Sequence, residues 1–215
     1  MSGDRGAAVC VPAALAAARA NPEVEFTLVG RGSERGADGR EPAPANVAWL
    51  EAGEVVAMTD HPRDAVRHKK DSSLRRAVDL VKTRNAHACV SAGNTGALMA
   101  TAHFVLRMIP GVERPAIASW IPSRGGHTFM LDLGANATAT PEQLRQFAVM
   151  GSVLAEDRAD SAAGPRVGLL NIGAEDIKGD QVVRAAHELL GAAGLNYVGF
   201  VEGHDIFGND VDVVV

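Results

Sequence analysis

The sequence predicts a mixed α/β fold with a mostly parallel sheet and helices on both of its faces. Two observations predict it. Short runs of β-branched and other apolar residues alternate with longer segments in which apolar residues recur at helical spacing. The helical segments are about 10–15 residues long, which is the length of a helix that crosses over between parallel strands. We expect one α/β domain over residues 1–215.

Helix starts and stops are marked by ordinary capping residues. Ser72 or Ser73 can cap one helix, and Thr140 followed by Pro141 and Glu142 is a typical start for another. The Asn21-Pro22 pair ends the first helix. The expected helices cover residues 12–20, 73–81, 95–108, 141–156 and 181–190.

The expected strands are short and mostly buried. They cover residues 24–29, 47–50, 86–90, 115–121, 127–133, 166–171, 195–201 and 211–215. The turn at 123–126 is so short that strands 115–121 and 127–133 are expected to form one antiparallel hairpin within the otherwise parallel sheet.

The composition is that of an ordinary globular protein and argues against several classes of protein. The chain has 47% hydrophobic and 22% charged residues and a net charge of −5, without the basic face of a nucleic-acid-binding protein. The short basic cluster of Arg67, His68, Lys69 and Lys70 is expected to be a solvated loop. Two cysteines, Cys10 and Cys89, make no disulfide framework, and no signal peptide or bilayer-length apolar stretch is present. These features predict a cytoplasmic protein.

The loop after the strand at 86–90 is the first candidate site. Ser91, Gly93, Asn94, Thr95 and Gly96 form a glycine-containing turn that leads into a helix. Glycines let the backbone approach a ligand, and the first N–H groups of a helix attract anions. The same turn can also serve only to connect a strand with a helix.

Two further strand ends carry polar side chains. Asp132 and Asn136 follow the strand at 127–133, and Asn171 and Lys178 follow the strand at 166–171. Asp132 and Asn136 either contact a ligand or hold the loop backbone through short hydrogen bonds. Lys178 either contacts phosphate or pairs with a surface carboxylate.

Together the three loops predict an anion site. The carboxyl ends of parallel strands meet at one edge of a sheet, where ligands of such folds bind. The chain has neither a GxxxxGK[ST] nor a GxGxxG motif, and no metal-ligand spacing of histidines. We therefore expect no nucleotide cofactor and no metal.

Several sequence blocks, in order, resemble those of bacterial phosphate acyltransferases, the PlsX family. They are KKDSS at 69–73, VSAGNTGALM at 90–99, ERPA at 113–116, LDLGAN at 131–136, QFAVMGS at 146–152, LNIG at 170–173 and KG at 178–179. The resemblance covers nearly the whole chain. It implies an acyltransferase that converts acyl-[acyl carrier protein] and orthophosphate to acyl phosphate and free carrier protein, for bacterial phospholipid synthesis.

The resemblance also implies properties of the whole molecule. The fold is expected to be a three-layer α/β/α fold of the isopropylmalate-dehydrogenase and phosphotransacetylase type. The resemblance implies a homodimeric, cytoplasmic protein that associates peripherally with the membrane. Its expected partner is acyl carrier protein, and no cofactor is expected.

The sequence departs from the family pattern in three places. Ser2 and Ala7 stand where the family's first turn has Gly and Pro, and the strand before that turn is missing. Ala137-Thr138-Ala139 replaces a Val-Asp-Cys type of segment. The Asp-Gly-Phe block that is expected after Val215 is absent. We therefore expect a family domain that is truncated at both ends.

Phosphate itself is the expected nucleophile, which fits the absence of a nucleophilic motif. The turn of Ser91, Gly93, Asn94, Thr95 and Gly96 is expected to bind phosphate, together with Asn171 and with Asp4 of the N-terminal turn. Lys178 would neutralise phosphate or the oxyanion. Asp132 and Asn136 would orient phosphate or the pantetheine arm, with Asp132 as a proton acceptor.

Two other functions stay open. One is a phosphate acetyltransferase-like enzyme that acts on acyl-CoA, and the other is a non-catalytic fragment that binds phosphate.

Overall fold

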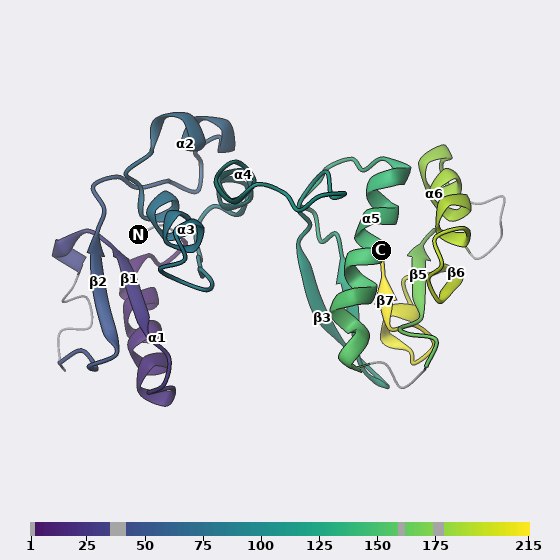
Figure 1. Cartoon of the computed structure of the whole chain (residues 1–215), viewed down its shortest axis with the longest axis horizontal. Helices are drawn as coiled ribbons and strands as arrows, with labels where there is room; N and C mark the ends of the chain where they lie inside the picture. Colours follow the sequence, from purple (N-terminus) through teal and green to yellow (C-terminus); the bar gives the residue numbers. More distant parts are fainter. Residues whose placement is uncertain (1–2, 35–41, 159–161, 174–178) are drawn as a thin grey trace. The chain divides into compact units, whose positions relative to one another are not determined.

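The computed structural model describes residues 3–34, 42–158, 162–173 and 179–215. The chain forms two compact units, Met1–Arg107 and Met108–Val215, and each is described by itself (Figure 1). The expectation of one domain over residues 1–215 stays a prediction.

The first unit is a small α/β unit. Its elements are α1 (Ala7–Ala20), β1 (Phe26–Gly30), the 3₁₀ turn η1 (Gly32–Glu34), β2 (Val47–Glu51), α2 (Pro62–His68), α3 (Ser73–Lys82) and α4 (Thr95–Leu106). The strands β1 and β2 are parallel, with Phe26 opposite Val47. Helices α1 and α3 contact β1, while α2 and α3 contact α4.

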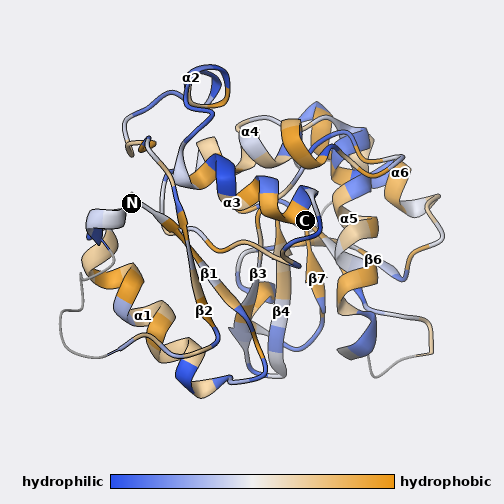
Figure 2. Ribbon diagram, turned by 60° about the vertical axis from the view of Figure 1, so that its left-hand side comes forward, coloured by the Kyte–Doolittle hydropathy of each residue, from blue (hydrophilic) through white to orange (hydrophobic). Residues whose placement is uncertain are grey.

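The helices of the first unit form because their apolar residues face one small core. Val56, Ala65, Leu74 and Ala97 are buried together there. Apolar and charged residues alternate along α3 (Figure 2), so that Leu74 and Val78 are buried while its two arginines are only half-buried. Ser72 caps α3 by accepting a hydrogen bond from the backbone N–H of Arg75 at 3.3 Å, as the sequence predicted.

The second unit is built on a five-stranded sheet in the order β3-β4-β7-β5-β6. Its elements are β3 (Ala118–Ser123), β4 (Gly126–Leu131), α5 (Pro141–Ala155), the 3₁₀ turn η2 (Glu156–Arg158), β5 (Val167–Leu170), α6 (Gln181–Gly191), β6 (Tyr197–Val201), the 3₁₀ turn η3 (Asp205–Phe207) and β7 (Val213–Val214). The pairs β4–β7, β7–β5 and β5–β6 are parallel. The β3–β4 pair is the expected antiparallel hairpin.

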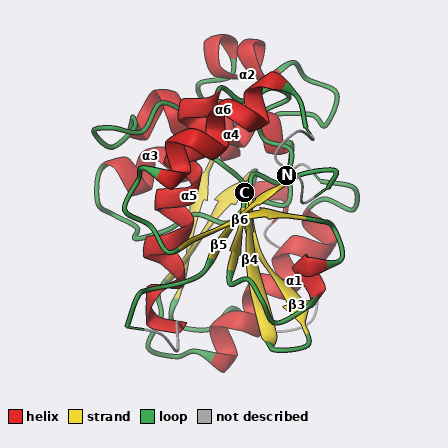
Figure 3. Cartoon of the chain, turned by 90° about the vertical axis from the view of Figure 1, so that its right-hand side faces the viewer, coloured by secondary structure: helices red, strands yellow, loops and turns green. Residues whose placement is uncertain are grey.

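The main core of the second unit lies between the sheet and two helices. Helices α5 and α6 pack against each other beside the strands (Figure 3). Phe147 of α5, Leu190 of α6 and Val213 of the central strand are completely buried in this core. A smaller cluster around Ile206 and Val214 also includes Val201 and Val211. The expectation of a mostly parallel α/β fold is therefore confirmed.

One local expectation is wrong, and another holds only in part. Residues 86–90 form no strand, and Val90 is 98% exposed, because no neighbouring strand pairs with this segment among the described residues. The basic cluster is exposed at Arg67, His68 and Lys70, as expected, but only part of it is a loop. Arg67 and His68 end α2, and Lys69 is half-buried and bonded to the segment before α2.

Candidate functional site

The turn before α4 is an exposed helix N-terminus. Ser91, Thr95 and Gly96 are exposed. The hydroxyl of Ser91 accepts a hydrogen bond from the Gly93 N–H at 3.2 Å, which fixes the turn. The backbone N–H groups of the first helical residues have no partner within the helix. The Ala97 N–H is used by the Asn94 cap, so the N–H groups of Thr95 and Gly96 are the ones suited to an anion.

Asn94 anchors this turn. Only 7% of the residue is exposed. Its Oδ1 atom caps α4 by accepting the Ala97 N–H at 2.9 Å. Its Nδ2 group lies 3.2 Å from the carbonyl oxygen of Ala57, 3.1 Å from that of Met58 and 2.9 Å from that of Asp60. Asn94 was predicted as a phosphate ligand, but its amide is already used to hold the turn against the preceding loop.

The N-terminal turn lies against the same loop. A Cβ atom on Gly3 would come within 2.6 Å of the Ala92 carbonyl oxygen, and the φ angle of Gly3 is +105°. Both observations require glycine at this position. Asp4 follows directly and is exposed. The turn before α1 thus lies against the turn before α4 through Gly3 and Ala92, while the part of Asp4 in a phosphate site stays a prediction.

In the second unit, Asp132 organises the loop after β4. Its Oδ1 atom accepts the N–H groups of Ile117 at 2.8 Å and Ala135 at 3.1 Å. Its Oδ2 atom accepts the N–H of Asn136 at 2.7 Å and the side-chain amide of Asn136 at 2.8 Å. Four donors on one carboxylate fix the loop firmly. These contacts favour the loop-holding alternative for Asp132, while its role as a proton acceptor stays a prediction.

Asn136 and Asn171 lie at the carboxyl ends of two strands of this sheet. Asn136 also donates from Nδ2 to the Pro115 carbonyl oxygen at 3.0 Å. Asn171 follows β5 and is 9% exposed, and its Oδ1 atom accepts the N–H of Ile172 at 2.9 Å. A Cβ atom on Gly179, whose φ angle is +87°, would lie 2.6 Å from the same oxygen. Since β4 and β5 both run parallel to β7, Asp132 and Asn171 follow strands that end at the same edge of the sheet.

The predicted site residues therefore fall into two groups. Ser91, Gly93, Asn94, Thr95, Gly96 and Asp4 belong to the first unit, and Asp132, Asn136 and Asn171 belong to the second. Lys178 lies outside the described residues. A single phosphate site formed by all of them stays a prediction.

The sequence reasoning missed Lys69 and Asp60. Lys69 forms an ion pair with Asp60 and donates to the Val55 carbonyl oxygen at 2.8 Å. The ion pair and hydrogen bond with Lys69 lower the pKa of the Asp60 carboxyl below its ordinary value. The sequence feature that could have pointed to Lys69 is its position in the segment 69–73, one of the blocks that resemble the family.

A cavity of about 510 Å³ lies elsewhere in the second unit and contains no predicted site residue. Arg166 and Asp212, which precede β5 and β7, are among its lining residues. They form a bidentate ion pair with N···O distances of 3.0 and 2.9 Å, and this pair lowers the pKa of Asp212. These two residues lie at the amino ends of their strands, opposite the edge that carries Asp132 and Asn171.

Across the described ranges, no cluster of three or more His, Cys, Asp or Glu side chains has a metal-binding arrangement. None of the described helices is both long and apolar enough to cross a bilayer.

Comparison with curated proteins finds relatives that align with the whole length of the chain. Curated phosphate acyltransferases from Methylococcus capsulatus and Alkalilimnicola ehrlichii are each 53% identical, over 218 and 221 residues. One from Legionella pneumophila is 48% identical over 219 residues. Each alignment covers 100% of this chain and 64% of the relative. The chain thus spans less than two thirds of the length of these relatives.

Among solved structures, the EutD phosphotransacetylase from Staphylococcus aureus superposes with a TM-score of 0.50 at 13% identity, covering 91% of this chain and 79% of that chain. This likeness supports a phosphotransacetylase-like α/β fold. A family model described as "Fatty acid synthesis protein" matches residues 1–215. With relatives named phosphate acyltransferase that align over its entire length, the chain belongs to the fatty acid synthesis protein family, which confirms the resemblance seen in its sequence blocks.

Proposed function

We propose that the protein is a phosphate acyltransferase that converts acyl-[acyl carrier protein] and orthophosphate to acyl phosphate and free carrier protein. The observation that carries the proposal is the turn before α4, which Asn94 anchors, within a chain whose relatives are named phosphate acyltransferase. The product would feed bacterial phospholipid synthesis.

The turn before α4 is suited to bind orthophosphate because it offers partial positive charge and hydrogen-bond donors. The positive end of the α4 dipole and the N–H groups of Thr95 and Gly96, the first two residues of the helix, attract an anion. The Thr95 side chain is exposed at the same place. Gly96 keeps the approach open and lies so close to α2 that a Cβ atom there would come within 2.9 Å of Pro62.

The reaction needs positioning more than a protein nucleophile. A phosphate oxygen attacks the thioester carbonyl carbon and forms a C–O bond. The tetrahedral oxyanion then collapses, the C–S bond breaks, and the carrier thiolate leaves and takes up a proton. Holding both reactants in attack geometry supplies part of the rate enhancement. Hydrogen-bond donors and a cation at the oxyanion supply more, and this is the role proposed for Lys178.

The second-unit residues have a positioning role in this proposal. Asp132 and Asn136 shape the loop after β4, and Asn171 shapes the neighbouring strand end. We propose that this edge receives phosphate or the pantetheine arm of the carrier. A homodimer, peripheral contact with a membrane and a cytoplasmic location are proposed from the family resemblance.

The test is an assay of the purified chain with long-chain acyl-[acyl carrier protein] and orthophosphate, in which acyl phosphate is trapped with hydroxylamine. We expect phosphate-dependent product. Lys178→Ala should lower the rate on the order of 10²-fold at saturating phosphate. The control Lys82→Ala changes a lysine at the last residue of α3 and should leave the rate unchanged. A wild-type rate for Lys178→Ala would contradict the electrostatic role of that lysine.

Two outcomes would favour the other functions. Faster turnover of acetyl-CoA than of the carrier thioester would identify a phosphate acetyltransferase-like enzyme. Phosphate binding in a calorimeter without product from either thioester would identify a non-catalytic phosphate-binding chain.

A further inference from the structure

Lys69 holds both ends of the loop formed by residues 55–60. Its ammonium group donates to the Val55 carbonyl oxygen at 2.8 Å and pairs with the Asp60 carboxylate. The side chains of Lys69 and Asp60 are 32% and 25% exposed, so this ion pair is partly shielded from water. Asp60 also accepts the N–H of Ala57 at 2.8 Å. One lysine therefore fixes the shape of the loop at its start and at its end.

The same loop forms the support of Asn94. The side-chain amide of Asn94 lies within 3.2 Å of three carbonyl oxygens of the loop, those of Ala57, Met58 and Asp60. Three carbonyls converge on one amide only while the loop keeps this conformation. The other end of the Asn94 side chain caps α4. A continuous chain of contacts thus runs from Lys69 through the loop and Asn94 to the first turn of α4.

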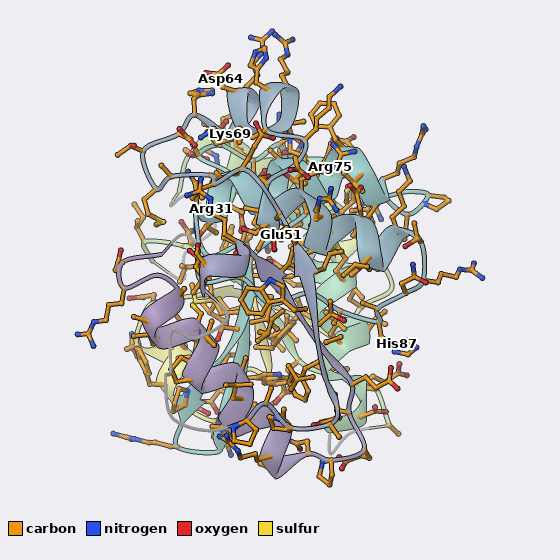
Figure 4. The ribbon with its side chains drawn as sticks, turned by 90° about the vertical axis from the view of Figure 1, so that its left-hand side faces the viewer. Arg31, Glu51, Asp64, Lys69, Arg75 and His87 are labelled. Atoms are coloured by element: carbon orange, nitrogen blue, oxygen red, sulfur yellow. The ribbon has the colours of Figure 1, made fainter. Side chains whose placement is uncertain are left out.

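We propose that Lys69 and Asp60 are positioning residues for the phosphate-binding turn, acting through residues 55–60 and Asn94. The inference rests on the proposed function, because it requires the turn before α4 to bind orthophosphate. Lys69 lies in the first unit (Figure 4), and the turn belongs to the same unit. Its charge is already compensated by Asp60, so its contribution to phosphate binding is indirect.

The expected effect follows from conformational populations. Without the ion pair, the loop and Asn94 are expected to spend only part of the time in the conformation described above, which is the one that binds phosphate. The apparent Kd for phosphate then equals the Kd of that conformation divided by the fraction of molecules that adopt it. A competent fraction of about one tenth gives a roughly tenfold weaker affinity. Lys69 lowers the pKa of Asp60, so the carboxylate that holds the lysine is ionised at neutral pH, where binding is measured.

The test is titration calorimetry of the full chain with inorganic phosphate. Lys69→Met keeps the aliphatic stem and removes the charge, and we expect a Kd about tenfold higher than that of the wild type. Lys70→Met is the matched control, since Lys70 is the exposed neighbour, and its Kd should equal that of the wild type. Lys69→Arg should restore most of the affinity, because arginine can also pair with Asp60.

A double-mutant cycle separates positioning from a direct contact. In an Asn94→Ala background the route to α4 is already broken, so Lys69→Met should weaken phosphate binding no further. A full additional tenfold loss there would overturn the proposal, as would wild-type affinity for Lys69→Met. If Lys69→Met fails to fold, Asp60→Asn gives the same test with the shape of the side chain preserved. A wild-type chain that binds no phosphate would instead contradict the proposed function.

Discussion

Gly151 shows how closely one residue can be constrained by the core. It lies in α5 against the central strands, and a Cβ atom there would come within 2.6 Å of Val213 and 2.9 Å of Leu131. Both neighbours are buried side chains that have little room to move. Gly151 therefore sets the distance between α5 and the sheet.

Replacing Gly151 with alanine should destabilise the protein although alanine favours helices. Overpacking is expected to lower the free energy of unfolding by about 1–3 kcal/mol, which exceeds the helix-propensity gain of about 1 kcal/mol. Gly191, the last residue of α6, is the matched control because a Cβ atom added there would have no other atom within 4 Å. Gly191→Ala should be neutral or slightly stabilising. Urea unfolding measures both, and equal effects would contradict the packing argument.

The ion pair between Glu142 and Arg145 predicts that the stability of the folded protein depends on pH. Hydrogen bonds from Arg145, at 2.9 and 2.5 Å, are the main cause that lowers the pKa of Glu142 from 4.5 to about 2. Since the folded-state pKa is below the unfolded value, this pair contributes stability above about pH 4.5 that is lost as the pH falls toward 2. An NMR titration of the Glu142 carboxyl should show a midpoint near 2, and Arg145→Met should move it toward 4.5. A wild-type midpoint near 4.5 would contradict the ion pair.

Among the elements, α5 has the most complete N-terminal cap of the described helices. The Thr140 hydroxyl accepts the Gln143 N–H at 3.2 Å, and the Gln143 side chain accepts the Thr140 N–H at 3.1 Å. Pro141 occupies the first helical position, where its missing N–H costs nothing. This capping box explains why the start of α5 could be predicted from the sequence.

Thr140→Ala should lower the free energy of unfolding by about 1 kcal/mol, because it removes the acceptor for a helix N–H. Thr138→Ala is the control, since Thr138 is exposed two residues earlier in the chain. Thermal unfolding should show a lower Tm for the first variant and little change for the second. If both variants melted with the wild type, the cap would contribute nothing measurable to stability.

Elements that carry their own signals were predicted well, and elements that depend on distant partners were not. The caps Ser72 and Thr140 are local, so the start of α5 was predicted at Pro141 and that of α3 to within one residue, with Ser72 or Ser73 as its cap. The segment 86–90 has a strand-like composition, but a strand exists only where another strand pairs with it. Helix α2 has only seven residues, too few to show a periodic pattern, and its signals were the cap His61 and Pro62.

For the whole molecule, the sequence predicted the positions of the polar residues that follow the strands better than it predicted the roles of these residues. The positions of Asp132 and Asn171 after two parallel strands are confirmed. Three of the four donors on Asp132 are local, as the loop-holding alternative expected, but the Ile117 N–H comes from 15 residues away and could not be foreseen. The contact of Lys69 with Val55 spans 14 residues and is likewise a product of the fold. A sequence pattern indicates local chemistry, whereas supporting contacts between distant residues exist only once the chain has folded.

The central position of β7 has a consequence for protein synthesis. Val213 and Val214 pair with β4 at residues 129–130 and with β5 at residues 167–168. A ribosome makes both outer partners long before it makes the strand that joins them. Until then the facing edges of β4 and β5 stay unpaired, and such edges are prone to aggregate or to recruit chaperones. The second unit can therefore complete its sheet only after translation has passed residue 214.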